Sequence, residues 1–240
     1  MQDEPKLTVF HGDGFEMLDG IKQPFIVVTD PPFNIGYHYN EYDDDVPKEE
    51  YYRLMGEILS YGDGAVMIHY PEELLNICFE NNIKPNDMFT WVYNSNCQRQ
   101  HRDAWYFRGA IPNFRKMRQP YKNMKDKRNI ERMKSGKSNG AMIYDWYYCN
   151  QVKNKSKNKT EHPCQMPVEI MRRIIGVLPE KYAIADPFGG SGSTMVAAMS
   201  LGRDCYISDI DEKYIDIIKS RADEYKQISN TPFEYDSWLA

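Results

Sequence analysis

Short apolar runs alternate with amphipathic stretches along most of this chain. A short apolar run between turn-forming residues is typical of a buried strand, and apolar positions three or four apart are typical of a helix. The runs predict strands at residues 7–10, 25–29, 65–68, 88–93, 183–186 and 204–208. The helical spacing predicts helices that begin near Pro47, Pro71, Pro167 and Asp211. This alternation predicts an α/β fold with a mostly parallel, doubly wound sheet that has helices on both faces.

The alternation stops between residues 94 and 160, where neither period persists. Basic residues in this segment are interleaved with aromatic ones, including Trp105, Tyr106 and Phe107. We therefore divide the chain into a catalytic core of residues 1–93 and 161–229, an insert at 94–160 and a C-terminal tail at 230–240. The tail has no pattern that predicts an element.

Composition excludes several classes of protein. The 240 residues are 41% hydrophobic with a mean hydropathy of −0.69, and no apolar run reaches the roughly 18 residues that span a membrane. The polar first residues lack the apolar segment of a secretory signal, so we expect a cytoplasmic protein without a membrane partner. Five cysteines without a C-x-x-C pair argue against a disulfide framework and against a zinc site, so no metal is expected.

The insert differs from the rest of the chain in charge. The whole chain has a net charge of −5, yet residues 94–160 contain 17 Lys and Arg against 4 Asp and Glu. Such a separation indicates a polyanionic partner that meets one region, and DNA is the partner we expect. The candidates for contact with DNA are Arg99, Arg102, Arg108, Arg115, Lys116 and Arg118. A basic insert that binds nucleic acid without sequence preference is the alternative.

The tetrapeptide Asp30-Pro31-Pro32-Phe33 ends the strand at 25–29, because two prolines cannot continue a hydrogen-bonded ladder. The Asp30 carboxylate and the Pro31 carbonyl form a pair of acceptors for the two N–H bonds of an exocyclic amine on a nucleobase. Such a pair directs the nitrogen lone pair toward an electrophile, and Phe33 offers a ring on which a flipped base can stack. The alternative is a plain proline-rich turn after a strand.

A second motif joins the strand at 183–186, a glycine-rich turn and a helix. Its sequence is Asp186-Pro187-Phe188-Gly189-Gly190-Ser191-Gly192-Ser193-Thr194. Glycines let a backbone turn sharply and approach a ligand closely. Asp209 follows the next strand, where a carboxylate can accept from both hydroxyls of a ribose, so the motif favours a nucleoside-type ligand over a plain turn. Met195 replaces the third glycine of a G-x-G-x-x-G pattern and no Walker sequence occurs, which disfavours a nicotinamide dehydrogenase and an NTPase.

The two motifs together resemble those of amino-methyltransferases that act on DNA and use S-adenosylmethionine. The tetrapeptide is similar to their catalytic motif and the glycine-rich turn to their cofactor loop. The resemblance covers about residues 7–93 and 160–226 and implies a Rossmann-like methyltransferase fold. The catalytic motif comes first, as in the β-type, circularly permuted group. In that group the first strand, here residues 7–10, lies beside the strand that ends at Asp209.

The resemblance also implies an activity and the residues for it. An acidic first position in the catalytic motif resembles adenine-N6 enzymes more than cytosine-N4 enzymes, which implies methylation of the N6 amino group of adenine in DNA. Its catalytic residues would be Asp30, Pro31, Pro32 and Phe33. Its contacts with S-adenosylmethionine would come from Asp13, His162, Gln165, Pro167, Asp186, Phe188, Gly189, Gly190, Ser191, Gly192, Ser193, Thr194 and Asp209.

Two of these assignments have alternatives or departures. Asp13 would accept a hydrogen bond from the adenine of the cofactor, although an Asx turn at a strand end explains it equally well. Met166 departs from the family pattern, which usually has Lys there, so any ion pair that this Lys makes is missing. The interleaved basic and aromatic residues make 94–160 the expected target-recognition insert of such a methyltransferase of the restriction-modification type. The resemblance also implies a homodimer, because the group often dimerises.

Three other readings of the sequence stay open. A cytosine-N4 enzyme or an RNA methyltransferase would have the same fold. A DNA-binding protein with a catalytically inactive methyltransferase scaffold is the third, and Met166 is the residue that favours it. In all of them, residues 34–46 predict a loop that can close over the site.

Overall fold

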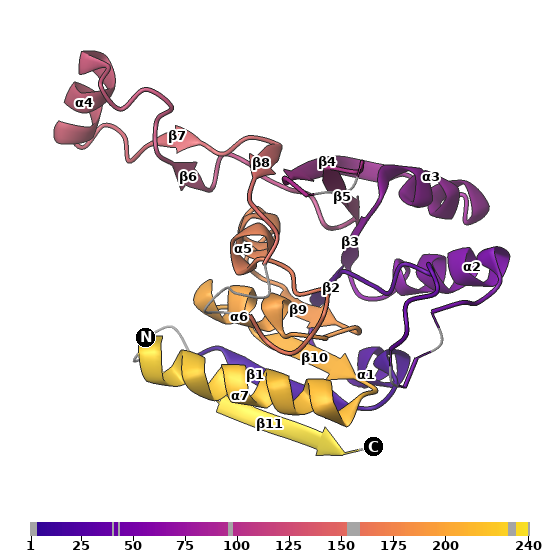
Figure 1. The fold of residues 1–240 in the computed structure, drawn as a ribbon. Helices are drawn as coiled ribbons and strands as arrows, with labels where there is room; N and C mark the ends of the chain where they lie inside the picture. Colours follow the sequence, from indigo (N-terminus) through magenta and orange to yellow (C-terminus); the bar gives the residue numbers. More distant parts are fainter. Residues whose placement is uncertain are drawn as a thin grey trace.

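A sheet of nine strands runs through the part of the chain that the computed structural model describes, which is residues 4–39, 41–42, 44–95, 98–152, 159–229 and 234–239. Its strand order is β11-β1-β10-β9-β2-β3-β5-β4-β8 (Figure 1). These strands are β1 (Lys6–His11), β2 (Phe25–Thr29), β3 (Gly64–His69), β4 (Pro85–Val92), β5 (His101–Arg108), β8 (Trp146–Tyr148), β9 (Ala183–Asp186), β10 (Cys205–Asp209) and β11 (Glu234–Leu239). All neighbours from β11 to β3 are parallel, and β5 runs antiparallel to both β3 and β4. The mostly parallel sheet predicted from the sequence is confirmed.

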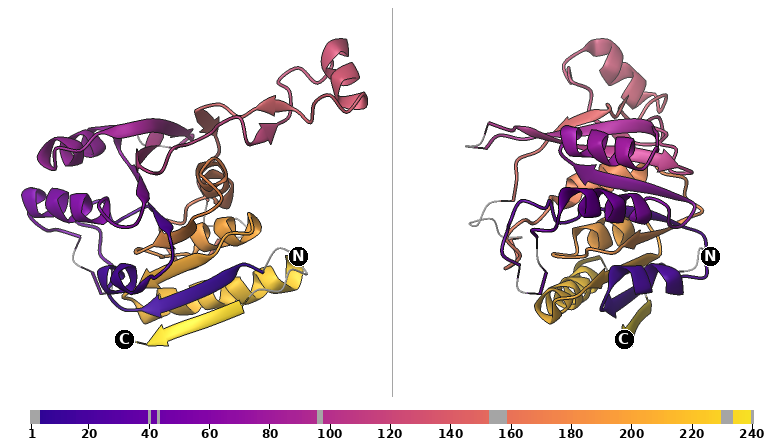
Figure 2. Two further views of the ribbon diagram at one scale, coloured as in Figure 1. Left: turned by 180° about the vertical axis from the view of Figure 1, so that it is seen from behind. Right: turned by 90° about the vertical axis from the view of Figure 1, so that its right-hand side faces the viewer.

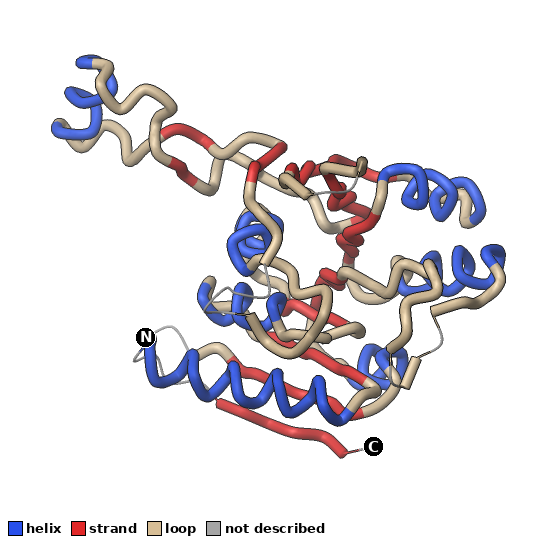
Figure 3. The backbone as a smooth tube through the Cα atoms, viewed as in Figure 1, coloured by secondary structure: helices blue, strands red, loops and turns tan. Residues whose placement is uncertain are grey.

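Helices cover both faces of this sheet (Figure 3). One face packs against α1 (Gly14–Gly20), α2 (Lys48–Ile58) and α3 (Pro71–Glu80), and the other against α5 (Val168–Gly176), α6 (Ser193–Ser200) and α7 (Glu212–Ser229). Successive side chains of a strand point to opposite faces, so Val27 packs with the cluster of α1 to α3 and Val28 with the cluster of α5 to α7. Because both faces are buried, the central strands β2, β3 and β9 are apolar except for their last residues.

The parallel strands bring distant parts of the sequence to one edge of the sheet. β2 ends just before Asp30, β9 ends at Asp186 and β10 ends at Asp209. β1 pairs with β10 in parallel with His11 opposite Asp209, and the Gly12 N–H donates to the Asp209 carbonyl at 3.0 Å. The first strand therefore lies beside the strand that ends at Asp209, as expected. In open α/β sheets this carboxyl edge is where ligands bind.

Two segments differ from the boundaries drawn on the sequence. β5 lies inside the 94–160 segment, yet it is a core strand between β3 and β4, and Trp105, Tyr106 and Phe107 are buried. The sequence hid this strand because basic residues at both ends of it, Arg102 and Arg108, continue the charge pattern of the insert. The C-terminal tail contains β11, which pairs in parallel with β1, and residues 230–233 and 240 lie outside the described residues.

The middle of the insert forms an arm that projects from the core (Figures 1 and 2). The arm consists of a two-stranded antiparallel sheet, β6 (Arg118–Gln119) and β7 (Ala141–Met142), and of α4 (Lys127–Lys134), which has no buried residue. It joins the core beside α5, where the Arg173 guanidinium donates to Gln119 Oε1 at 3.3 Å and lies 3.5 Å from the centre of the Tyr147 ring. The arm is therefore a basic, exposed element that is anchored at its base.

Tyr106 allows a test of how the core is packed. Its side chain is fully buried, and its hydroxyl has no hydrogen-bond partner among the described residues. Burying an unpaired hydroxyl costs about 1–3 kcal/mol, so Tyr106→Phe is expected to leave the free energy of unfolding unchanged or to raise it. Tyr51→Phe is the matched control, because the equally buried Tyr51 hydroxyl donates to the Pro32 carbonyl at 2.8 Å and its loss should destabilise by about 1 kcal/mol. Urea unfolding of both variants measures the difference, and a clear loss of stability in Tyr106→Phe would contradict the prediction.

Candidate active site

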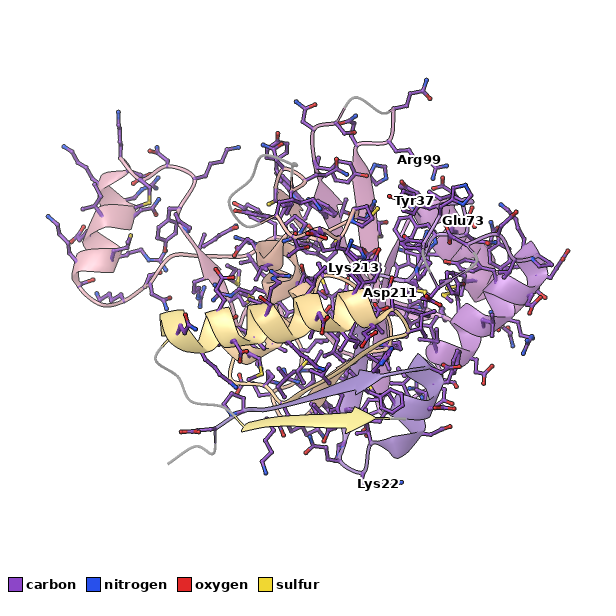
Figure 4. All side chains as sticks on the ribbon, turned by 60° about the horizontal axis from the view of Figure 1, so that its bottom comes forward. Lys22, Tyr37, Glu73, Arg99, Asp211 and Lys213 are labelled. Atoms are coloured by element: carbon purple, nitrogen blue, oxygen red, sulfur yellow. The ribbon has the colours of Figure 1, made fainter. Side chains whose placement is uncertain are left out.

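A pocket of about 420 Å³ opens at the carboxyl edge of β2, β9 and β10. All four residues of the Asp30-Pro31-Pro32-Phe33 motif line it, and so does the turn from Asp186 to Ser191. Tyr37 and Asp211, which are labelled in Figure 4, also line the pocket and come from the loop after β2 and from the start of α7. The fold therefore brings the two sequence motifs, which are more than 150 residues apart, to the walls of one cavity.

Asp186 holds the glycine-rich turn in place. Its carboxylate is buried and accepts from the Thr29 hydroxyl at 2.8 Å, from the Thr194 hydroxyl at 2.6 Å and from the Phe188 N–H at 3.2 Å. These bonds tie β2, β9 and α6 together at the floor of the pocket. Burial raises the pKa of Asp186 to about 7, and the two hydroxyl donors oppose this shift. Asp186 thus shapes the site through contacts within the protein.

The turn itself requires glycine. Gly190 has a φ of +47° and Gly192 a φ of +72°, in the left-handed region where glycine alone is free of strain. A Cβ on Gly189 would lie 2.6 Å from Ile207 Cγ1 and 2.9 Å from the Ser208 carbonyl oxygen, so this residue packs directly on β10. The turn is therefore pressed against the neighbouring strand, and Gly189 and Gly190 line the pocket without side chains.

Two carboxylates stand at the end of the pocket beside β1 and β10. Asp209 accepts from the Gly190 N–H at 2.8 Å and from the Asp211 N–H at 3.0 Å, and its pKa is raised by burial. A carboxylate has lone pairs for further donors, so Asp209 can still accept from a ligand. Asp13 accepts from the Phe15 N–H at 2.8 Å and caps α1, and it also lines the pocket. Asp13 therefore both caps α1 and lines the pocket.

The other end of the pocket contains Asp30. Its Oδ2 lies 3.7 Å from Arg102 Nη1, and its Oδ1 is buried without a hydrogen-bond partner among the described residues. Burial raises the pKa of Asp30 to about 6, and the Arg102 charge limits this rise. At neutral pH the group is a carboxylate with a free acceptor atom in an apolar setting, which is an unfavourable arrangement that a ligand donor would relieve.

A chain of hydrogen bonds supports the Asp30-Pro31-Pro32-Phe33 motif. His69 Nδ1 accepts from the Tyr70 N–H at 2.7 Å, so the neutral ring has its proton on Nε2 and donates it to the Tyr51 hydroxyl at 2.8 Å. Tyr51 in turn donates to the Pro32 carbonyl at 2.8 Å. Burial lowers the pKa of His69 to about 3, which keeps the ring neutral. His69 also stacks on Phe33 with ring centres 4.1 Å apart, so the orientation of Phe33 is fixed.

The loop after the Asp30-Pro31-Pro32-Phe33 motif is held in place by Asp44. Asp44 is buried and accepts from the N–H groups of Asn34, Ile35 and Tyr37 at 2.7, 3.2 and 3.1 Å. The Asn34 side chain also bonds to both backbone groups of Val46. Asp44, the middle residue of the acidic run at 43–45, therefore joins the end of this loop to its beginning. Asp43 lies outside the described residues.

The segment before α5 meets the glycine-rich turn. The His162 ring lines the pocket next to Gly190, where a Cβ would lie 2.8 Å from His162 Nε2, and burial lowers its pKa to about 4. The Met166 carbonyl accepts from the Ser193 hydroxyl at 2.7 Å, and its sulfur lies 3.9 Å from Arg102 Nη1. Three residues expected to contact a cofactor do not line the pocket, namely Gln165, Pro167 and Gly192. Gln165 instead accepts from the Thr160 N–H at 2.7 Å.

The six basic residues expected to contact DNA lie in different places. Arg102 is partly buried and lines the pocket, because β5 runs antiparallel to β3 and brings its first residues to the carboxyl edge of β2 and β3. The same geometry takes Arg108 to the opposite edge, where it pairs with Gly64 and donates to the Gly62 carbonyl at 2.8 Å. The remaining four are exposed near the arm or the pocket, and they are Arg99, Arg115, Lys116 and Arg118. Arg99 forms an ion pair with Glu72, and Lys116 with Glu180 at 2.9 Å.

Several residues of the site escaped the sequence interpretation. The pocket is also lined by Phe15, Tyr39, Tyr42, Tyr70, Cys164 and Tyr214, and the support from Tyr51 and His69 lies directly behind it. None of these belongs to a spacing motif. The one signal in the sequence is position, because Tyr70 lies two residues after the strand predicted at 65–68 and thus near its carboxyl end.

The described residues contain neither a metal-binding cluster nor a membrane-spanning helix. Within them, no group of three or more His, Cys, Asp or Glu side chains is arranged to hold a metal ion. Of the helices described, none is both long and apolar enough to cross a bilayer.

Comparison with known proteins identifies the family. The DNA methylase family N6_N4_Mtase matches residues 26–220, which include both motifs. Type II methyltransferase M.HpaI of Haemophilus parainfluenzae is 25% identical over 223 residues, 82% of this chain and 68% of that protein. Two solved structures share the fold. PvuII DNA methyltransferase (cytosine-N4-specific) has a TM-score of 0.59 at 16% identity over 98% of each chain, and the M1.HpyAVI–SAM complex has 0.54 at 21% over 90% of this chain and 99% of that one. The chain therefore belongs to the N6_N4_Mtase family of DNA methylases.

Proposed function

We propose that this DNA methylase transfers a methyl group from S-adenosylmethionine to the N6 amino group of adenine in DNA. The observation that carries the proposal is the buried Asp30 Oδ1, an acceptor without a partner among the described residues, beside the Phe33 ring in the wall of the pocket. An exocyclic amine supplies the missing donor, and its base supplies a flat surface for the ring.

The pocket fits S-adenosylmethionine, the cofactor of this methyltransferase family. Six acidic residues line the pocket (Asp13, Asp30, Glu41, Asp186, Asp209 and Asp211), and Arg102 is the one Lys or Arg among its described lining residues. Such a charge balance favours a cationic sulfonium and opposes the pyrophosphate of a dinucleotide. When bound, the cofactor supplies a methyl group that is activated for transfer to a nucleophile. Asp209 and the turn at 189–191 would hold its nucleoside, because they form the glycine-lined end of the pocket.

The residues around Asp30 would prepare the amine. Asp30 Oδ1 and the Pro31 carbonyl accept its two N–H bonds, which leaves the nitrogen lone pair free to react. The Tyr51 bond to Pro32 and the stacking of His69 on Phe33 keep these groups in position before the base arrives. Positioning of this kind lowers the activation barrier of methyl transfer, because the groups that bind the amine are already ordered in the folded protein.

The arm would provide contact with the DNA around the flipped base. Arg115 and Arg118 are exposed at its base, and α4 adds basic residues in its last turn. Phosphate contacts of this type give salt-dependent binding. We accordingly propose target recognition for the insert predicted at 94–160, without its core strand β5. The similarity to M.HpaI supports a Type II role in modification.

Methylation of cytosine N4 is the second candidate. It is favoured by the similarity in fold to PvuII DNA methyltransferase, which is cytosine-N4-specific. Both bases present an exocyclic amine, so the acceptor pair at Asp30 suits either one. The acidic residue at position 30 supports adenine.

Product analysis decides between these candidates. The full chain is incubated with duplex DNA and methyl-labelled S-adenosylmethionine, and the digested nucleosides are examined by mass spectrometry. We expect labelled N6-methyl-2′-deoxyadenosine, which an Asp30→Asn control should form at least about a hundredfold more slowly. Labelled N4-methyl-2′-deoxycytidine would instead make cytosine the target base. No labelled nucleoside on varied DNA, despite measurable cofactor binding, would refute DNA methylation by this site.

A further inference from the structure

Arg102 occupies the space between the two groups that would receive the target base. It enters from β5, its guanidinium carbon lies 4.6 Å from the centre of the Phe33 ring, and its Nη1 lies 3.7 Å from Asp30 Oδ2. Its side chain is 14% exposed. A cation from the neighbouring strand thus contacts both the acceptor and the stacking surface of the proposed base site.

The contact with Asp30 differs from that of a permanent ion pair. A separation of 3.7 Å is beyond hydrogen-bond distance. Asp30 Oδ1 and Arg102 Nε are both buried, and neither has a hydrogen-bond partner in the described part of the chain. Buried charges that serve the fold are usually hydrogen-bonded on both sides, because the interaction must offset their desolvation. This pair leaves donors and acceptors unused, as expected of a contact that opens.

The guanidinium resembles the edge of an aminated base in the properties that this site recognises. Both are planar, both stack on aromatic rings, and both point N–H donors at an acceptor. A base that stacks on Phe33 has its ring centre about 4.5–7 Å from the Phe33 centre. Arg102 already lies within that space, so the base and the guanidinium cannot be there together.

We propose that Arg102 is a placeholder for the target base: its guanidinium fills the site between Asp30 and Phe33 in the free protein and moves aside when the base enters. The proposal rests on the proposed function, because it assumes that this site receives a base. It explains how a pocket with an unsatisfied carboxylate stays filled and ordered in the absence of DNA.

The structure also offers a place to which the side chain can move. The rings of Trp91 and Tyr70 each lie 5.7 Å from the guanidinium carbon, and the Met166 sulfur lies 3.9 Å from Nη1. Aromatic faces stabilise a cation that has lost its anionic partner. Arg102 can therefore leave Asp30 by a short movement toward Trp91 or Tyr70.

Binding of an isolated base tests the proposal without knowledge of the recognition sequence. The full-length wild type, Arg102→Ala and the control Arg53→Ala are titrated with 9-ethyladenine by calorimetry. Arg53 lies on α2, is exposed and pairs with Glu57 at 3.9 Å, so its variant should bind like the wild type. If the guanidinium fills the site about nine-tenths of the time, Arg102→Ala should bind about tenfold more tightly. Added guanidinium ion should then compete with 9-ethyladenine in Arg102→Ala, a response that a purely structural role would not produce.

Several results would overturn the proposal. Equal or weaker binding by a folded Arg102→Ala would show that the arginine does not exclude the base or contacts it directly. If Arg102→Ala does not fold, Arg102→Met, which keeps more of the side-chain volume, takes its place in the titration. Failure of both variants to fold would show that the contact between Arg102 and Asp30 is needed for the fold. Adenine methylation by the wild type together with unchanged base binding in the variants refutes the placeholder alone. Tighter base binding without any methylation refutes the proposed reaction and keeps the base site.

Discussion

Asp30→Asn is expected to reduce methyl transfer by at least about a hundredfold and, above pH 6, to make the fold more stable. Asparagine has nearly the same shape as aspartate, but it lacks the negative charge that attracts both N–H bonds of the amine. The loss of one well-placed electrostatic partner commonly has an effect of this size. Cofactor binding should persist, because Asp209, which would hold the nucleoside, ends β10, and β9 lies between β10 and the strand that precedes Asp30.

The gain in stability follows from the raised pKa of Asp30. Burial raises this pKa from 3.8 to about 6 in the folded protein, so the folded state holds a proton that the unfolded state has already released. The resulting penalty is absent below about pH 4, grows as the pH rises from about 4 to about 6, and is then constant at about 3 kcal/mol. Asparagine stays neutral and avoids this penalty, so the two proteins should differ in stability at pH 8 and not at acid pH.

Denaturant unfolding at several pH values tests this linkage. The control is Asp216→Asn, which makes the same chemical change at an exposed position on α7 and should leave stability nearly constant. A variant Asp30→Asn that is no more stable than the wild type at pH 8 would show that burial of the Asp30 carboxylate does not destabilise the folded protein.

The raised pKa of Asp30 also predicts that methyl transfer by the wild type declines as the pH falls through about 6, because the protonated carboxyl is a weaker acceptor.

The parts of the fold that the sequence predicts are those specified by local pattern. The strands that end at Thr29, Asp186 and Asp209 are apolar runs bounded by prolines, glycines or acids, and the sequence predicts their ends within a residue or two. The two motifs follow these strands directly. Their meeting in one pocket could also be expected, because the carboxyl ends of parallel strands share one edge of a sheet.

The features that the sequence does not predict depend on contacts between residues that are far apart in the chain. β5 has charged residues near both of its ends, so the sequence does not identify it as a core strand. Its centre is buried because β3 and β4 flank it in the sheet. Arg102 appeared in the sequence as one of many basic residues for DNA, and the antiparallel direction of β5 brings it to Asp30 instead. The bond between Tyr51 and His69 spans 18 positions and joins a helix to a strand. No local pattern specifies such partners, because a side chain acquires them only when the sheet is assembled.

Gly190→Ala is expected to weaken cofactor binding by at least about tenfold while lowering stability by only about 1–2 kcal/mol. Gly190 has a φ of +47°, and a Cβ there would lie 2.8 Å from the His162 ring, which lines the pocket. The added methyl group must displace His162 or the N–H that Gly190 donates to Asp209, and either shift alters the end of the pocket that would hold the nucleoside.

Gly202→Ala separates this effect from backbone strain. Gly202 has a φ of +67°, but a Cβ there would meet no atom within 4 Å, so the substitution imposes a similar strain without a steric contact. Both variants should therefore lose a similar amount of stability in urea unfolding, and only Gly190→Ala should lose affinity for S-adenosylmethionine in calorimetry. Equal affinities in the two variants would mean that the turn at 189–191 does not hold the cofactor. The comparison therefore tests the cofactor end of the pocket independently of methyl transfer, as the Asp30 variant tests the base end.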